Sequence, residues 1–234
     1  MMMKKPAPMF PILPTPAQPQ DSRLPKADPA TPEFWNSRFE AAATPWDQGG
    51  VPQCLERYLK QSPDDRAVPR AHADSARPSV LIPGCGSAHE VRMFADLGWE
   101  VSAIDFSSAA VAHAKRILGA HTPLAGMVRE ADFFSAALGK ERFDLVYERA
   151  FLCALPRRLW PDWAQQIARV IPVGGRLTGF FFTDEAEKGP PFGLGAGELE
   201  AMLTPHFTRL QRLDPVDSVG VFAGKETWQV WVRN

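Results

Sequence analysis

The sequence predicts an α/β protein with a seven-stranded, mostly parallel, doubly wound sheet that ends in an antiparallel hairpin. From residue 79 onward, short apolar runs alternate with amphipathic stretches of helical period, a pattern typical of parallel sheets. The first apolar run leads directly into a glycine-containing turn and a helix, which is how nucleotide-type βαβ units begin. The alternation stops near the C-terminus, where residues 219–222 and 227–232 predict two strands of a hairpin joined by Ala-Gly-Lys-Glu.

Composition bounds the class of protein. The chain has 234 residues, 45% of them hydrophobic, and a net charge of −1, so we expect one soluble domain with extensions and no attraction to nucleic acid or to an anionic membrane. No apolar run approaches the roughly 18–20 residues that span a bilayer. The three cysteines are widely spaced and odd in number, which disfavours disulfides and a cysteine-based zinc site. We expect a cytoplasmic monomer.

The domain boundaries follow from proline content and polarity. Residues 1–30 hold eight of the 23 prolines and predict a disordered tail. Residues 31–234 form the folded domain, in which helices within 31–62 form an N-terminal lid and residues 79–234 form the core. Thr31 and Pro32 suit the start of a helix over 33–42, a second helix covers 51–60, and the polar stretch 61–78 is a linker.

Within the core, each element follows the one before it at the spacing of a doubly wound fold. The strands are expected at 79–82, 100–104, 125–129, 143–147 and 175–182. A helix after the glycine turn carries Val91, Phe94, Ala95 and Leu97 on one face. A helix over 107–118 is capped by Ser107 or Ser108, and a long helix covers 157–170.

The glycine turn departs from the dinucleotide fingerprint in an informative way. Gly84 and Gly86 leave room for a ligand to approach the backbone, but the third glycine of G-x-G-x-x-G is replaced by His89. That change disfavours a pyrophosphate-binding cofactor. We interpret His89 as a surface residue at a helix start and Cys85 as a small buried filler.

Two acidic residues at strand ends indicate a nucleoside. Asp105 ends the second strand, 19 residues after Gly86, where an acid accepts hydrogen bonds from ribose hydroxyls. Asp132 follows the third strand and can accept from the amine of adenine, with the neighbouring Phe133 covering the base. Nucleoside contacts without a phosphate site predict S-adenosylmethionine as the cofactor.

Several longer motifs carry a family resemblance. They read Phe34-Trp-Asn-Ser-Arg-Phe39, Thr44-Pro-Trp-Asp-Gln-Gly49, Val80-Leu-Ile-Pro-Gly-Cys-Gly86, Ala103-Ile-Asp-Phe-Ser107, Phe143-Asp-Leu-Val-Tyr-Glu-Arg-Ala-Phe-Leu-Cys-Ala-Leu155 and Gly189-Pro-Pro-Phe192. From about residue 33 to the C-terminus the chain resembles the thiopurine S-methyltransferase family, including its thiol and halide methyltransferase branch. The resemblance implies a class I methyltransferase fold and a small-molecule methyl acceptor.

The resemblance also implies roles for individual residues. Positions that match Trp35, Phe39 and Trp46 close the N-terminal segment over cofactor and substrate. Arg149 matches a position near the sulfonium and the acceptor that is Arg in thiopurine-type members and Tyr in the other branch, whereas Trp46 keeps the Trp of that second branch. The acceptor atom, sulfur, selenium or halide, is therefore left open.

The physical chemistry agrees with this assignment. Aromatic faces attract a sulfonium cation by roughly 0.5–2 kcal/mol per contact, and a cation such as Arg149 favours an anionic nucleophile. The five histidines have no metal-ligand spacing, so we expect no metal. Two other interpretations stay open: an NAD-dependent oxidoreductase, and a methyltransferase-like protein that binds ligand without turnover.

Overall fold

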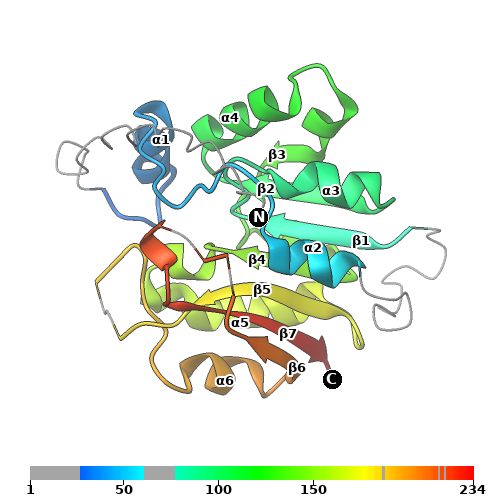
Figure 1. The fold of residues 1–234 in the computed structure, drawn as a ribbon, viewed down its shortest axis with the longest axis vertical. Coiled ribbons are helices and arrows are strands. Elements are labelled where there is room, and N and C mark those ends of the chain that lie inside the picture. Colours follow the sequence, from blue (N-terminus) through cyan, green and yellow to red (C-terminus); the bar gives the residue numbers. More distant parts are fainter. Residues whose placement is uncertain (1–26, 61–76, 186–187, 216, 219) are drawn as a thin grey trace, which may run out of the picture.

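The computed structural model describes residues 27–60, 77–185, 188–215, 217–218 and 220–234 (Figure 1). Most of the expected N-terminal tail and nearly all of the expected linker over 61–78 lie outside the described residues.

A single sheet of seven strands organises the described residues, in the order β3-β2-β1-β4-β5-β7-β6 (Figure 1). The parallel strands are β1 (Ser79–Pro83), β2 (Glu100–Asp105), β3 (Val128–Glu130), β4 (Leu145–Arg149) and β5 (Arg176–Phe182). The strands β7 (Glu226–Arg233) and β6 (Phe207–Leu213) complete the sheet in antiparallel orientation. The predicted fold class is confirmed.

The two faces of the sheet bury alternate side chains under different helices. Val80 and Ile82 point into a core that also contains residues of α2 (Gln53–Lys60), α3 (Glu90–Asp96) and α4 (Ser108–Leu118). Leu81 points to the opposite core, under α5 (Trp160–Val170) and α6 (Glu198–Leu203). The period-2 alternation of β side chains produces these two layers from one buried run. The helix α1 (Pro32–Glu40) packs against α4 (Figure 1).

The predicted C-terminal hairpin is wrong in its first strand. Residues Gly220–Phe222 form a 3-10 turn, and the antiparallel partner of β7 is β6, which the sequence analysis did not identify. β6 is an edge strand whose side chains are mostly exposed, so it lacks the apolar pattern that marks buried strands. The long connection between β6 and β7 instead returns Phe222 to the interior, where its ring lies 5.7 Å from that of Phe182.

Other boundaries differ by a turn. The strand expected over 125–129 begins only at Val128 because Pro123–Met127 form a 3-10 helix. The helix expected over 157–170 begins as the 3-10 turn Arg157–Leu159 before α5. Two further 3-10 turns are Leu138–Lys140 and Leu152–Ala154. The cap at Ser107 is confirmed, since its side chain accepts from the Ala110 amide, whereas Leu97 is 47% exposed rather than buried.

The segment expected to form a lid divides into two parts. In α2, Leu55 and Leu59 are buried in the core, and the Tyr58 ring lies 5.7 Å from Trp228 of β7. Only α1 and the following loop over 41–50 line the cavity described below. The helix α2 is therefore part of the sheet's covering layer.

Candidate active site

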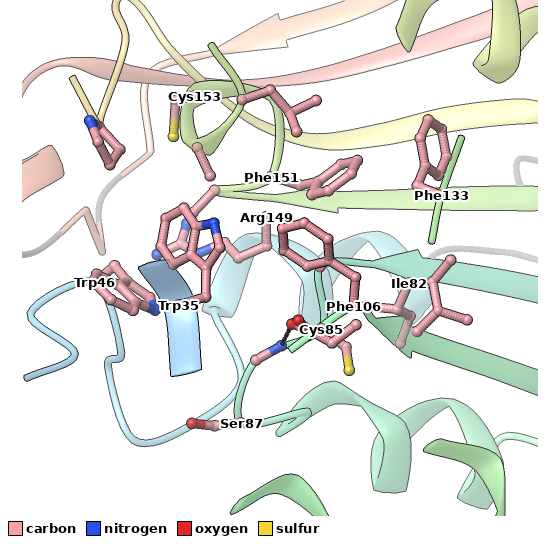
Figure 2. A pocket seen from close by; sticks show the side chains of 18 of the residues that line it. Trp35, Trp46, Ile82, Cys85, Ser87, Phe106, Phe133, Arg149, Phe151 and Cys153 are labelled. Atoms are coloured by element: carbon pink, nitrogen blue, oxygen red, sulfur yellow. Dashed lines mark hydrogen bonds between the residues drawn. The ribbon is translucent and has the colours of Figure 1, made fainter. Parts of the chain in front are cut away.

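A cavity of about 1050 Å³ opens at the carboxyl ends of β1, β2 and β4 (Figure 2). In this sheet β1 lies between β2 and β4, so the chain reverses direction across the sheet at this point, and open α/β sheets bind ligands at such a reversal. All nine residues expected in the site line the cavity: Trp35, Phe39, Trp46, Gly84, Gly86, Asp105, Asp132, Phe133 and Arg149. The fold thus brings together residues that are spread over about half of the chain.

The glycine turn needs both of its glycines. Gly84 and Gly86 have φ of +57° and +50°, in the left-handed region that side chains disfavour. A Cβ at Gly84 would lie only 2.4 Å from Cδ2 of Phe151. The open space at Gly84 therefore accommodates an aromatic ring of this chain, which is a more specific reason than the ligand approach expected from sequence.

Asp105 is fixed at the end of β2 by the neighbouring backbone. Its Oδ2 accepts from the Gly86 amide at 3.1 Å and its Oδ1 from the Ser107 amide at 2.9 Å. Burial raises its pKa to about 6, although hydrogen bonds from the amides of Ser107, Gly86 and Phe106 oppose the shift. The carboxylate is thus oriented at the cavity wall, and Phe106 beside it is a lining residue that the sequence analysis missed.

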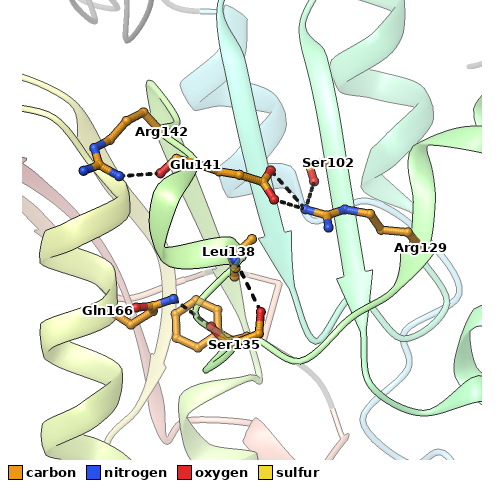
Figure 3. Close-up of polar contacts among 8 residues, drawn as sticks. Ser102, Arg129, Ser135, Leu138, Glu141, Arg142 and Gln166 are labelled. Carbon is orange, nitrogen blue, oxygen red and sulfur yellow. Dashed lines mark hydrogen bonds and ion pairs between the residues drawn. The ribbon is translucent and has the colours of Figure 1, made fainter.

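The loop after β3 places an acid and an aromatic ring side by side. Asp132 is exposed and its Oδ1 accepts from the Phe134 amide at 2.9 Å. Phe133 is buried, its ring lies 5.1 Å from Phe151, and its carbonyl accepts from Gln166 of α5 at 2.9 Å. Figure 3 shows Gln166 reaching this loop from α5, whose buried residues share a core cluster with Phe133, so α5 holds the loop in place.

Three aromatic rings from α1 and the next loop cover the cavity. The Trp46 ring centroid lies 5.5 Å from that of Trp35 and 6.1 Å from that of Phe39, both with near-perpendicular planes. The Trp35 indole N–H donates to the carbonyl of Pro29 at 2.8 Å. Edge-to-face packing of this kind fixes ring orientation, so Trp35 and Trp46 present defined faces to the cavity (Figure 2).

Asp47 ties this loop to the glycine turn. One carboxylate oxygen accepts from the Ser87 hydroxyl, and the other lies 2.8 Å from Nε2 of His89. Burial alone would raise the pKa of Asp47, but hydrogen bonds from His89, Ser87 and the Gly49 amide hold it well below its usual range. The hydrogen bond to Asp47 raises the pKa of His89. His89 stands at the start of α3, as expected, but its side chain is only 21% exposed and is paired with Asp47, so it is not the free surface residue expected. We call the Asp47–Ser87–His89 group the latch.

Arg149 ends β4 with part of its guanidinium unpaired. Its Nη1 lies 3.4 Å from Oε1 of Glu226, and its Cζ lies 4.0 Å above the Phe180 ring. Its Nη2 is buried and has no hydrogen-bond partner among the described residues. Gln48, which also lines the cavity, has a buried Nε2 in the same condition. Buried donors without partners are costly, so two groups at this wall are suited to a ligand's acceptor atoms.

Two more buried carboxylates surround Arg149. Glu148 accepts from the amides of Phe151 and Leu152 at 2.8 and 3.1 Å, and burial raises its pKa to about 7. Glu90, which lines the cavity, has its Oε1 3.5 Å from the Tyr147 hydroxyl, and burial raises its pKa as well. Neither acid stands out in the sequence, because each belongs to an element, a helix start or a strand, that needs no charge for its formation.

Backbone strain also concentrates here. Ala42, Ala88 and Ala150 are the non-glycine residues of the described ranges with positive φ, from 52° to 58°, and all three line the cavity. Such conformations cost of order 1–3 kcal/mol each and cluster at functional sites. The strain is an independent indication that this cavity, rather than the surface elsewhere, is the working part of the molecule.

Cys85 lies buried in the glycine turn. Burial raises the pKa of its thiol well above the usual range, which fits the small buried filler expected. Within the described ranges, no group of three or more histidine, cysteine, aspartate or glutamate side chains is arranged to hold a metal ion. None of the helices that the structure describes is long and apolar enough to cross a membrane.

The residues present fit S-adenosylmethionine. An oriented acid at the end of β2, a backbone turn with positive φ and a set of aromatic faces suit the ribose, the amino-acid chain and the sulfonium of that molecule. The fold and this cavity define a class I S-adenosylmethionine-dependent methyltransferase. The chain belongs to the thiopurine S-methyltransferase family, whose model matches residues 30–234.

Curated relatives agree with the family. A probable thiol methyltransferase 2 of Arabidopsis thaliana is 28% identical over 204 residues, 86% of this chain and 84% of that protein. The thiocyanate methyltransferase 1 of the same plant is 30% identical over 180 residues, covering 73% and 71%. A thiopurine S-methyltransferase of Vibrio vulnificus (strain YJ016) is 27% identical over 197 residues, covering 76% and 84%. Both branches anticipated from the motifs are therefore represented.

Solved structures share the fold. Magnesium protoporphyrin IX methyltransferase from Synechocystis PCC 6803, with bound S-adenosylhomocysteine, matches with a TM-score of 0.62 at 16% identity, over 86% of this chain and 97% of that one. A protein from a study of disulfide-to-thioacetal conversion in echinomycin biosynthesis also reaches 0.62, at 18% identity, over 86% and 92%. The methyltransferase prediction is confirmed, and the NAD-dependent interpretation is dropped.

Proposed function

We propose that this enzyme methylates the sulfur of a small thiol, in its thiolate form, at the wall formed by Arg149 and Trp46. The observation that carries the proposal is the buried, unpaired Nη2 of Arg149 at a cavity lined by aromatic rings. A cation there favours an anionic nucleophile. The relatives named for thiols, thiocyanate and thiopurines support the choice of sulfur.

The roles of the cofactor-side residues follow from their positions. We assign ribose binding to Asp105, adenine contacts to Asp132, Phe133 and Phe106, and the chain of the cofactor to the turn at Gly84 and Gly86. Trp35, Phe39 and Trp46 face the sulfonium and cover it. These assignments use the orientation of Asp105 by two backbone amides and the aromatic packing above the turn.

The chain's contribution to catalysis is positioning and electrostatics. When bound, S-adenosylmethionine supplies an activated methyl group, which passes to the acceptor sulfur as the carbon–sulfonium bond breaks and a neutral thioether leaves. A thiol with a pKa near 8.5 is partly ionised at neutral pH, and Arg149 shifts it further toward the thiolate. The aromatic cover excludes water, and alignment can lower the barrier by several kcal/mol, up to about 7–11.

The test is an acceptor screen that measures S-adenosylhomocysteine release from thiols, a thiopurine, a selenol, thiocyanate and iodide. We expect the highest turnover with thiols or the thiopurine, and a large loss in Arg149→Ala with partial retention in Arg149→Lys. Arg157→Lys is the matched control, because Arg157 also lies over an aromatic ring, Trp160 at 4.4 Å, and pairs with Glu198 outside the cavity lining. Equal rates in Arg149→Ala and the wild type would contradict the role of Arg149.

Binding of S-adenosylmethionine without methyl release to any acceptor in the screen would favour a binding protein instead. We further propose that the enzyme is a cytoplasmic monomer whose partner is the small acceptor alone. Analytical ultracentrifugation of the full chain tests the monomer directly, and a stable dimer would contradict it.

A further inference from the structure

The cavity cation has a partner placed behind it. Arg149 lines the cavity, whereas Glu226 does not. Oε1 of Glu226 lies 3.4 Å from Nη1 of Arg149. The two side chains are only 13% and 4% exposed. The guanidinium packs against the ring of Phe180, which is the register partner of Trp228 in the neighbouring strand β7. The pair is thus built into the sheet, with one edge of the guanidinium toward Glu226 and Nη2 left unpaired.

The other acids near Arg149 are engaged elsewhere. Glu148 accepts from two backbone amides at the turn after β4, and Glu90 lies by the Tyr147 hydroxyl. Among the ion pairs of the described part of the chain, Glu226 alone is within 4 Å of Arg149. Burial raises the pKa of Glu226, the charge of Arg149 opposes that rise, and the charge of Asp217, on the connection before β7, adds to it. Glu226 is therefore the acid best placed to change the charge that Arg149 presents.

Cys153 shows what a thiol at this wall experiences. It lines the cavity and is buried. Burial raises the pKa of Cys153, the charges of Glu148 and Glu226 raise it further, and the charge of Arg149 lowers it. A sulfur in this part of the cavity thus senses both members of the ion pair, with opposite effects on thiolate formation.

We propose that Glu226 is a specificity-determining positioning residue: it partly neutralises Arg149 and so limits how strongly the cavity attracts an anionic acceptor. This inference rests on the proposed function, since it concerns the same acceptor wall. A fully unbalanced buried cation would hold any small anion tightly in the ground state, which does not accelerate the chemical step. The pair instead leaves an attraction strong enough to favour a thiolate and weak enough to release competing anions.

The expected size follows from Coulomb's law at short range. Removing one negative charge about 6–8 Å from the reacting sulfur, at an effective dielectric constant near 20, should move the acid limb of the pH–rate profile to lower pH by roughly 1.5 to 2 units. The same change should tighten binding of a simple anion by about 30- to 100-fold at low ionic strength.

The experiment uses the full chain with S-adenosylhomocysteine bound and sodium thiocyanate as the probe, measured by calorimetry. We expect Glu226→Gln to bind thiocyanate more tightly than the wild type, Glu226→Asp to lie between them, and Arg149→Ala to lose binding. Glu198→Gln is the matched control, because Glu198 pairs with the aromatic-stacked Arg157 outside the cavity lining; it should equal the wild type. A pH–rate profile with a thiol acceptor is the second readout.

The outcomes separate this inference from the proposed function. Thiocyanate binding requires no turnover, so a wild type that methylates no thiol refutes the proposed function and leaves the role of Glu226 testable. Unchanged or weaker thiocyanate affinity in Glu226→Gln overturns the inference, as does the absence of binding in every variant. Should Glu226→Gln fail to bind S-adenosylhomocysteine through misfolding, Glu226→Asp decides, because an affinity equal to the wild type would then overturn the inference.

Discussion

The cofactor half and the acceptor half of the cavity differ in how the chain builds them. The cofactor half consists of the turn at Gly84 and Gly86, Asp105 and the loop at Asp132 and Phe133, all within about 50 residues at consecutive strand ends. It is held mainly by backbone amides, such as those that donate to Asp105. Local chain geometry therefore determines this half.

The acceptor half joins segments that are far apart in sequence. We define it by Trp46, Arg149, Cys153, Pro190 and Phe222, which come from the N-terminal loop, the end of β4 and two connections near the C-terminus. Its contacts are between side chains, among them the Arg149–Glu226 pair, 77 residues apart. The comparison indicates that cofactor binding depends mainly on local chain geometry, with smaller contributions from Trp46 and the latch, whereas acceptor choice depends on contacts between distant segments.

The largest expected effect comes from changing the acid of the cofactor half. Asp105→Asn should weaken S-adenosylmethionine binding by about 10- to 100-fold, because hydrogen bonds to a charged group contribute roughly 1.5–3 kcal/mol. Calorimetry measures the affinity, and Asp96→Asn, a change at an exposed position on α3, is the control. An unchanged affinity in Asp105→Asn would contradict the proposed role of Asp105 in binding the cofactor.

The pH dependence of binding sharpens the same point. Burial raises the pKa of Asp105 to about 6, and ribose hydroxyls donate to the ionised form. Ionisation is thus favoured in the complex, so affinity is full above that pKa and is lost as pH falls through it, by roughly tenfold per pH unit. Titrations from about pH 8 to about pH 5 should show this loss, and Asp105→Asn should abolish it.

Removing the aromatic cover should have an intermediate effect. Trp46→Ala is expected to weaken S-adenosylmethionine binding by about 3- to 30-fold, because a cation–aromatic contact contributes roughly 0.5–2 kcal/mol. Trp46→Phe should retain most of it, since the aromatic face remains. S-adenosylhomocysteine, which lacks the positive charge, should lose less affinity in Trp46→Ala; equal losses for both ligands would argue against a contact with the sulfonium.

The latch should have the smallest effect, and it should act as pH rises above the usual pKa of histidine. The hydrogen bond to Asp47 raises the pKa of His89, so the charged pair is complete below the usual pKa of histidine and is lost as pH rises through the raised value. We expect S-adenosylmethionine affinity to fall about 2- to 5-fold over that rise, consistent with a half-buried ion pair. His89→Gln should flatten this alkaline limb in calorimetry, and a limb that persists in the variant would exclude His89 as its origin.

The sequence by itself determined the parallel part of the sheet and the cofactor half. Period-2 burial of Val80, Leu81 and Ile82 and the positions of Asp105 and Arg149 at strand ends can be read from short stretches, since parallel strands bring their carboxyl ends to one edge. The aromatic motifs before the core also indicated which residues cover the site.

Only the tertiary structure decided the rest. The edge strand β6 was missed because an exposed strand carries little apolar pattern, and residues 220–222, which belong to a stretch whose composition suits a strand, form a 3-10 turn at the cavity instead. The partners of His89 and Arg149 could not be predicted either, because Asp47 and Glu226 meet them across 42 and 77 residues of chain. Such contacts depend on how loops pack over the finished sheet, and no local property of the sequence specifies that packing.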